Sequence, residues 1–161
     1  MASPAPSPQF TLEPATSADL DEVMRIMGDA FGDGFGEAWT RSQLSGILPM
    51  PGVSLTLARN GAGGGAAGFS LSRTVADEAE LLLIAVDPRL QRRGVGRQLM
   101  DRFLAEALAA NLARVHLEVR DGNPAVAMYR EMGFEAVGRR RDYYTGADKK
   151  RHDAITLARS P

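Results

Sequence analysis

Apolar side chains recur at helical spacing over residues 20–31, which predicts an amphipathic helix near the start of the chain. Thr16 and Asp19 precede it at the spacing of a capping box, in which each side chain bonds the backbone of the other. A short strand is expected at residues 10–12, and a second short helix after Thr40. The N-terminal part of the chain is therefore predicted to be a strand followed by two helices.

Strand patterns occupy the middle of the chain. Residues 53–58 and 67–75 are predicted to form paired strands joined by a glycine-rich turn. Residues 81–86 are apolar throughout, which suits a central strand covered on both faces. A second amphipathic helix comes next, and its apolar stripe consists of Val95, Leu99, Met100, Phe103, Leu104, Ala107 and Leu108.

The last third of the chain returns to strands. Apolar and polar side chains alternate over residues 115–119, Asn123-Pro124 suits a helix start, and Gly133 suits a helix end. Residues 134–137 and 154–157 supply the final strands. Strands on either side of helices, with a strand–helix–strand unit at the centre, predict an α/β sandwich around a mixed sheet.

Composition narrows the function. The 161 residues suit one domain, expected at residues 10–161 after a disordered lead-in at residues 1–9 that is rich in Pro, Ser and Ala. A formal net charge of -1 gives no general reason to expect direct nucleic-acid or membrane binding. With no cysteine, disulfides, thiolate zinc sites and a cysteine acyl-enzyme are excluded, and His116 and His152 are too isolated to suggest a metal site. No apolar run approaches the ~20 residues of a membrane span and no signal-peptide pattern is present, so a cytoplasmic protein is expected.

The charged residues are distributed unevenly along the chain. Two basic clusters stand out: Arg89, Arg92, Arg93, Arg97 and Arg102, and then Arg139, Arg140, Arg141, Lys149, Lys150 and Arg151. They are interpreted either as solvated surface together with contacts to cofactor phosphates, or as a docking surface for an acidic or RNA-containing partner.

A basic, glycine-containing turn from Gln91 to Arg97 lies between the apolar strand and the second amphipathic helix. Glycine lets the backbone approach a ligand, and the free N–H groups of a helix start favour a bound anion. No lysine stands where a Walker loop needs it, and Leu99 replaces the third glycine of a dinucleotide fingerprint. A different pyrophosphate-bearing cofactor is therefore expected.

A literal GxGxxG occurs at residues 63–68, but the residues after it alternate like a strand and do not open a helix. We interpret this segment as a hairpin connection without a binding role.

Two segments carry a family resemblance. Residues 84–88 with residues 91–96 resemble the acetyl-CoA-binding signature of the GNAT acetyltransferase superfamily, and Asn123 with residues 128–134 resembles its second signature. Residues 117–120, 141–144 and 152–155 further resemble the bacterial ribosomal-protein-alanine N-acetyltransferase (RimI) family, and residues 37–40 do so more weakly. The likeness covers about half of the chain, residues 78–157.

The resemblance implies a GNAT-like α/β fold: a mixed, mostly antiparallel sheet flanked by helices on both faces, with a splayed central pair of parallel strands. It implies acetyl-CoA as cosubstrate and no metal. Glu118 would be the general base, Tyr129 the general acid, and Tyr143 and Tyr144 would lie near a peptide-binding groove. The implied cofactor-binding residues are Ile84, Ala85, Val86, Arg92, Arg93, Gly94, Val95, Gly96, Arg97 and Asn123, the last of these on the pantetheine arm.

Other interpretations of these residues stay open. Glu118 is also compatible with a solvent-facing or ion-paired strand position, with Arg120 as a partner, and Tyr129 with an amphipathic core position. Asn123 and Tyr129 are one residue closer together than is usual in the family, and Asn123-Pro124 indicates that the shortening lies at the helix entrance.

The chemistry expected is direct attack by an amine in a ternary complex, because no cysteine is present to carry the acetyl group. An α-amino group has a pKa of about 7.7–8.0, whereas a lysine side chain has a pKa near 10.4. A lone glutamate can therefore deprotonate the α-amino group more easily. The sequence thus favours a peptide α-N-acetyltransferase acting on an N-terminal alanine, with a small-subunit ribosomal protein as the expected partner. A small-molecule amine N-acetyltransferase and a non-catalytic acyl-CoA-binding module are the alternatives.

Overall fold

A computed structural model describes residues 10–32, 34–61 and 63–161, so the expected lead-in at residues 1–9 lies outside the described residues. The strands are β1 (Phe10–Pro14), β2 (Val53–Asn60), β3 (Ala66–Val75), β4 (Glu78–Val86), β5 (Arg114–Arg120), β6 (Glu135–Thr145) and β7 (Arg151–Arg159). The helices are α1 (Leu20–Phe31), α2 (Arg41–Ile47), α3 (Val95–Ala109) and α4 (Ala125–Glu131), with short 3-10 turns η1 (Ser17–Asp19) and η2 (Pro88–Leu90).

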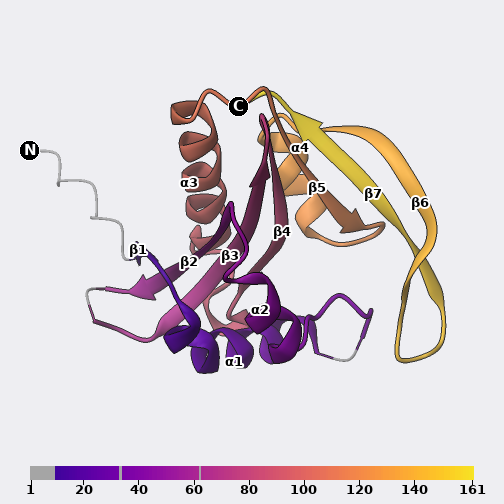
Figure 1. The fold of residues 1–161 in the computed structure, drawn as a ribbon. Helices are drawn as coiled ribbons and strands as arrows, with labels where there is room; N and C mark the ends of the chain where they lie inside the picture. The colour runs from indigo at the N-terminus through magenta and orange to yellow at the C-terminus, as the bar shows by residue number, and fades with distance from the viewer. Residues whose placement is uncertain (1–9, 33, 62) are drawn as a thin grey trace, which may run out of the picture.

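The seven strands form one sheet in the order β1-β2-β3-β4-β5-β7-β6 (Figure 1). Neighbouring strands are antiparallel throughout, except that β4 and β5 run parallel at the centre. Helices α1 and α2 pack on one face of the sheet, and α3 and α4 on the other. The predicted mixed, mostly antiparallel sheet with helices on both faces is confirmed.

The central strand β4 changes its facing at Leu82. Leu71 of β3 pairs with Leu83 and Ser72 with Leu81, so Leu82 is an extra residue that forms a β-bulge. As a result Leu81 packs with α3, whereas Leu83 packs with α1 on the opposite face. A bulge bends and twists its strand, and this one lies where β4 parts from β5.

The pairing of β4 with β5 stops early. It runs from Glu78 opposite Arg114 to Leu81 opposite Leu117, and the remaining residues of both strands diverge. The splayed parallel pair that the resemblance implied is therefore present. Beyond Leu81, the edge of β4 that faces β5 carries no ladder from that strand.

Local sequence signals are realised where they were expected. Thr16 and Asp19 form a capping box before α1, and α2 begins after Thr40, which forms a second capping box with Gln43. The glycines of residues 63–68 lie in and beside the connection from β2 to β3, which confirms the hairpin interpretation.

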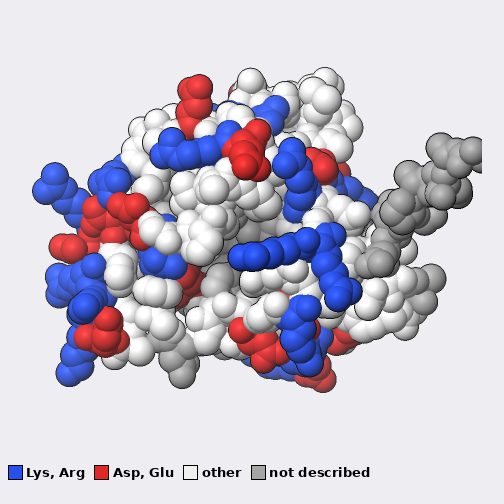
Figure 2. Space-filling model, turned by 180° about the vertical axis from the view of Figure 1, so that it is seen from behind, with Lys and Arg blue, Asp and Glu red and all other residues white. Residues whose placement is uncertain are grey.

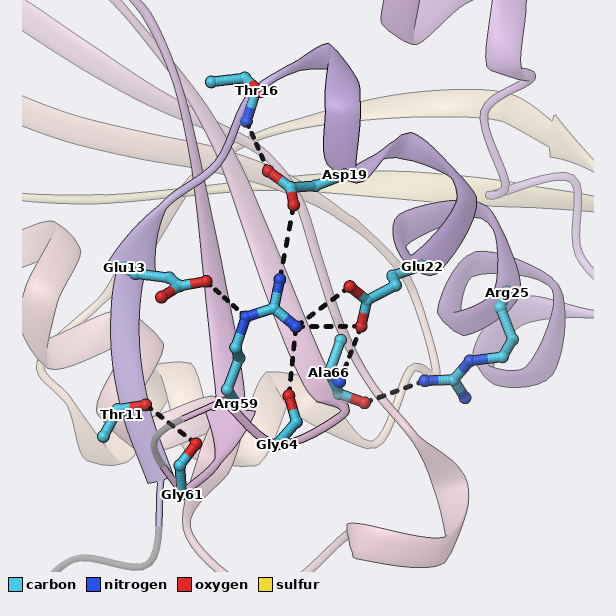
Figure 3. A network of polar contacts seen from close by, with 10 residues as sticks. All are labelled: Thr11, Glu13, Thr16, Asp19, Glu22, Arg25, Arg59, Gly61, Gly64 and Ala66. Carbon is cyan, nitrogen blue, oxygen red and sulfur yellow. Dashed lines mark hydrogen bonds and ion pairs between the residues drawn. The ribbon is translucent and has the colours of Figure 1, made fainter.

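Arg59 of β2 ties the first strand to the first helix (Figure 3). Its guanidinium bonds the carboxylates of Glu13, Asp19 and Glu22, and it also donates to the Gly64 carbonyl oxygen at 3.2 Å. These contacts bring β1, η1, α1 and the hairpin together at one end of the sheet, remote in the chain from the residues with predicted chemistry.

Two expectations need correction. The final strands are much longer than residues 134–137 and 154–157, because β6 is exposed along almost its whole length and shows no apolar alternation from which to predict it. Leu108 was placed on the apolar stripe of α3 but is 63% exposed, since it lies about 100° around the helix from the buried Ala107, beyond the edge of the stripe that meets the sheet.

Candidate active site

A cavity of about 380 Å³ opens between the splayed ends of β4 and β5. Its walls come from β4, β5, α4, β6 and the segment between α1 and α2, which are distant in the sequence. Six of the residues predicted from the sequence line it: Ile84, Glu118, Asn123, Tyr129, Tyr143 and Tyr144. Strand divergence is what creates this space, because a continued ladder would close it.

Glu118 projects from β5 on the face opposite Leu117 and Val119, whose side chains are in the core. Its side chain is 18% exposed, and its Oε1 lies 2.8 Å from Nε of Arg140 on β6. The expected pairing with Arg120 is wrong, because Arg120 is bound to Glu37 instead. Glu118 is thus both ion-paired and part of the cavity wall.

Tyr129 of α4 combines two environments. Its ring belongs to the buried core and meets Phe134 edge to face, with centroids 6.0 Å apart. The residue also lines the cavity. Burial, with the nearby charge of Glu37 as a lesser cause, raises the pKa of the Tyr129 hydroxyl far above its usual range. Tyr129 therefore keeps its proton throughout the neutral and mildly alkaline range, as a general acid must.

Tyr143 and Tyr144 form the wall contributed by β6. Their rings pack edge to face with centroids 5.0 Å apart, and the Arg140 guanidinium lies 5.3 Å from the Tyr143 ring centroid. Burial, followed by the charge of Glu37, raises the pKa of Tyr144 to about 12. The two rings give this side of the cavity a rigid aromatic surface.

Asn123 lies at the entrance of α4, and both ends of its side-chain amide are bonded. Oδ1 accepts from the Ala125 backbone N–H at 2.9 Å, which caps the helix. Nδ2 donates to Oε2 of Glu37 at 2.9 Å. One of the two amide N–H bonds of Asn123 is thereby used, and one is left over.

The basic turn from Arg92 to Arg97 leads into α3, as predicted. Gly94 has φ 84° and Arg92 φ 65°, so the chain turns through two left-handed residues before the helix begins. No side chain among the described residues caps the N-terminus of α3. A Cβ added to Gly96 would lie 3.7 Å from both Met128 of α4 and Val86 of β4, so this helix start sits between the end of β4 and α4.

A model of the acetyltransferase (GNAT) family matches residues 20–134. The chain belongs to this family. The match includes the splayed strands, the basic turn and Tyr129, so the expected membership of the GNAT superfamily is confirmed by the sequence as well as by the fold.

Individual relatives point to one branch of the GNAT family. The chain is 38% identical over 144 residues to N-alpha-acetyltransferase RimI of Mycobacterium tuberculosis, covering 86% of this chain and 87% of that one. It is 43% identical over 93 residues to [Ribosomal protein bS18]-alanine N-acetyltransferase of Escherichia coli, which is 57% of this chain and 62% of the relative. The crystal structure of the ribosomal-protein-S18-alanine N-acetyltransferase from Escherichia coli superposes with a TM-score of 0.84 at 31% identity, over 94% of this chain and 93% of that one.

Not every predicted cofactor residue faces the cavity. Ile84 lines it, but the side chain of Ala85 packs with α1 and α2 on the other face of the sheet, and Val86 packs near the start of α3.

Asp87 fixes the start of the basic turn that leads into α3. Its buried carboxylate receives the Arg89 guanidinium at 2.8 Å and the Arg25 guanidinium at 3.2 Å, and it caps η2 through the Arg89 backbone N–H. These contacts, with Arg89 the largest, hold the pKa of Asp87 well below its usual range. Arg89 therefore serves an internal ion pair.

Several residues of the two basic clusters form ion pairs with acidic neighbours. Arg139 pairs with Asp121 and Asp153, and Arg102 pairs with Glu106. Figure 2 shows Lys and Arg interspersed with Asp and Glu over the face opposite the view of Figure 1. This favours the interpretation as solvated surface over a continuous basic docking surface.

The side chains in the cavity wall that were not predicted from the sequence include Glu37, Trp39 and Glu80. Glu37 and Trp39 lie in the segment between α1 and α2, where only a weak likeness to the RimI family was visible. Glu80 lies on β4 opposite His116 of β5, 3.7 Å from its Nε2. Glu80 gave no signal of its own, because it stands with Glu78 just before the apolar run of residues 81–86.

Among residues 10–32, 34–61 and 63–161, no cluster of three or more His, Asp or Glu side chains is placed to hold a metal ion. Over the same residues, no helix has both the length and the apolar character that a membrane crossing requires.

Proposed function

We propose that this protein is an acetyl-CoA-dependent peptide α-N-acetyltransferase that modifies an N-terminal alanine of a small-subunit ribosomal protein, with residues 10–161 acting as one domain. The observation that carries the proposal is that Glu118, Tyr129 and Tyr144 line one cavity between the splayed strands. The substrate class is supported by two relatives whose names specify the alanine of ribosomal protein bS18 and an N-alpha-amine.

The residues around the cavity fit acetyl-CoA. The diverging edge of β4 at Ile84 offers backbone groups to an extended pantetheine arm, much as a neighbouring strand would. The uncapped start of α3, reached through Gly94 and Gly96, offers N–H groups to a pyrophosphate. Both features end at the same side of the sheet, because Gly96 lies against Val86.

In the proposed reaction Glu118 accepts a proton from the substrate ammonium, so that the neutral amine attacks the thioester carbonyl carbon. The new C–N bond forms as the C–S bond breaks, and Tyr129 donates its proton to the leaving thiolate sulfur. The attacking nitrogen then loses its second proton through solvent to the Tyr129 phenolate, and Glu118 releases the first proton to solvent, so both residues return to their starting states. Each residue contributes within the ~10²–10⁴-fold usual for general acid–base catalysis. No covalent bond to the protein is needed, which agrees with the absence of cysteine from the sequence.

An N-terminal amine suits this cavity better than a lysine side chain. An α-ammonium loses its proton near pH 7.7–8.0, so one carboxylate suffices as base. The aromatic wall of Tyr143 and Tyr144 stands beside Glu118 and leaves room for a small first side chain followed by peptide backbone.

A small-molecule amine acetyltransferase is the second candidate. Its support is the cavity volume of about 380 Å³, which lies within the ~300–1,000 Å³ typical of small-ligand sites. A diffusible amine would use the same Glu118 and Tyr129.

The deciding experiment measures release of coenzyme A thiol from acetyl-CoA with short peptides that differ only at the first residue. The panel includes a peptide with a blocked N-terminus and an internal lysine, and a set of small amines. Turnover confined to free peptides beginning with alanine is the expected result. Turnover on small amines alone would replace the proposal with the second candidate, and no turnover together with tight coenzyme A binding would favour a non-catalytic module.

A further inference from the structure

Residues 36–39, between α1 and α2, line the cavity, and a buried ion pair holds them there. Oε1 of Glu37 accepts from Nε of Arg120 at 3.1 Å, and the two side chains are only 13% and 9% exposed. The Arg120 guanidinium also lies 3.6 Å from the ring centroid of Phe35, in a cation–π contact. The residues on either side of Glu37 are thus held in place by the end of β5.

The β6–β7 hairpin holds the same segment from the other side. The Ala147 N–H donates to the Gly34 carbonyl oxygen at 3.2 Å, and a Cβ at Gly36 would be 2.6 Å from the Thr145 carbonyl oxygen. Phe35 packs edge to face on His152 of β7, with centroids 5.3 Å apart. These backbone and side-chain contacts of its neighbours restrain the position of Glu37.

A buried ion pair is weak evidence of a stabilising role, because desolvation of both groups offsets most of their attraction. What distinguishes Glu37 is its second carboxylate oxygen, which accepts from Nδ2 of Asn123 at 2.9 Å. Asn123 lies 86 residues away in the sequence, at the entrance of α4. Glu37 therefore joins this segment to a second residue of the cavity wall.

The orientation of Asn123 depends on Glu37. With Oδ1 on the Ala125 N–H and one Nδ2 hydrogen on Glu37, the plane of the amide is set and its second hydrogen is aimed. Without the carboxylate, only the helix cap would restrain the amide, and its free N–H would lose direction. The charge of Glu37 is also a cause, after burial, of the raised pKa of Tyr129 and of Tyr144, and all three residues line the same cavity.

We propose that Glu37 is a positioning residue of the cofactor site: through Arg120 and Asn123 it aims the remaining N–H of Asn123 at the pantetheine arm. The inference rests on the proposed function, in which Asn123 binds that arm. Glu37 itself touches neither reacting atom and takes no proton.

Glu37→Gln is a sharp test because a carboxylate offers two acceptors and an amide only one. Whichever way the glutamine amide is turned, its NH₂ faces a donor, either Arg120 or Asn123, and one bond is lost. Asn123 can restore its bond by flipping only if it gives up the cap on Ala125.

The measurement is the dissociation constant of coenzyme A by titration calorimetry, which needs no turnover. Glu37→Gln is expected to raise it about tenfold, the value of one good hydrogen bond. In an Asn123→Ala background the same substitution is expected to change it less than about twofold, because the two residues act as a unit. Glu13→Gln, which removes one carboxylate from the remote Arg59 network of Figure 3, is the matched control and leaves the constant unchanged.

A second variant serves as the control for effects on folding. Glu37→Gln alone leaves Arg120 buried without a counter-charge, whereas Glu37→Leu/Arg120→Met removes both charges together with the acceptor of Asn123, and is expected to show the same loss of affinity. Unchanged affinity in that double variant, or an equal effect of Glu37→Gln with and without Asn123, would overturn the inference. If Asn123→Ala alone leaves coenzyme A binding unaltered, the proposed role of Asn123 fails instead.

Discussion

Nε of Arg140 lies 2.8 Å from Oε1 of Glu118, so the carboxylate proposed as general base is ion-paired across two strands. Arg140 is 61% exposed, and such pairs contribute little to stability because water screens them. The pair is better understood as a contact that restrains the Glu118 side chain in the cavity wall.

Glu118→Gln is expected to lower kcat with an alanine-initiated peptide by about 10²-fold, at the low end for loss of a general base. The acid limb of the pH–rate profile should flatten at the same time, since the group that must be ionised is gone. Glu78→Gln on β4 is the comparison, and it should keep both the rate and the limb. An acid limb of unaltered shape in Glu118→Gln would remove Glu118 from the base role.

Tyr129→Phe is expected to lower kcat about 10²-fold while the KM for acetyl-CoA changes less than about threefold, because the hydroxyl acts on the leaving sulfur and the ring is kept. Burial raises the pKa of Tyr129 far above the usual value of about 10, so wild-type activity should not decline from loss of this proton up to pH 10. A pre-steady-state burst shows whether product release limits the rate. Equal single-turnover rates of variant and wild type would exclude Tyr129 as the acid.

The sequence predicted the elements better than the contacts. The capping box at Thr16, the helix start after Thr40, the β2–β3 hairpin and the basic turn are local features, whose residues lie within a few positions of one another. The bulge at Leu82 changes which face of the sheet the following side chains of β4 point to. It could not be predicted, because residues 81–86 are all apolar and such a run does not indicate which face each side chain occupies.

Long-range pairings in the site were inaccessible for a different reason. Glu37 meets Arg120 and Asn123 only because the sheet brings the ends of β5 and the α1–α2 segment together, 83 and 86 residues apart in sequence. The motif residues Glu118 and Tyr129 were found through resemblance, but the partner of Glu118 was not, since Arg140 reaches it only because β7 and β6 follow β5 in the sheet order.

Asp87→Asn is expected to reduce the free energy of unfolding at pH 7 by roughly 2 kcal/mol, because charge-assisted hydrogen bonds to Arg89 and Arg25 are lost at a buried site. The pKa of Asp87 is depressed in the folded protein, so the wild-type advantage is present above the unfolded-state value near 3.9 and is lost as the pH falls below it. Urea unfolding of both proteins at pH 7 and pH 3 checks this. A difference between them that is as large at pH 3 as at pH 7 would contradict the assignment.

The literal GxGxxG at residues 63–68 can be tested for a structural role and for a binding role by substituting its glycines one at a time. A Cβ at Gly68 would be 2.8 Å from the Ala85 carbonyl oxygen and 3.0 Å from Val95 Cγ1, so β3 approaches β4 and the start of α3 as closely as only glycine allows. Gly65, three residues earlier, has nothing within 4 Å of an added Cβ. Gly68→Ala is therefore expected to cost about 1–3 kcal/mol of unfolding free energy, whereas Gly65→Ala stays within about 0.5 kcal/mol of wild type.

Urea unfolding measures the two costs, and coenzyme A titration of Gly65→Ala decides the role. A phosphate-binding glycine loop would lose affinity when a methyl group enters it, because the backbone could no longer approach the ligand. A hairpin connection would not. Weakened coenzyme A binding by Gly65→Ala at unchanged stability would mean that the motif binds a ligand after all. Unchanged binding would leave the turn from Arg92 to Arg97 as the proposed pyrophosphate site.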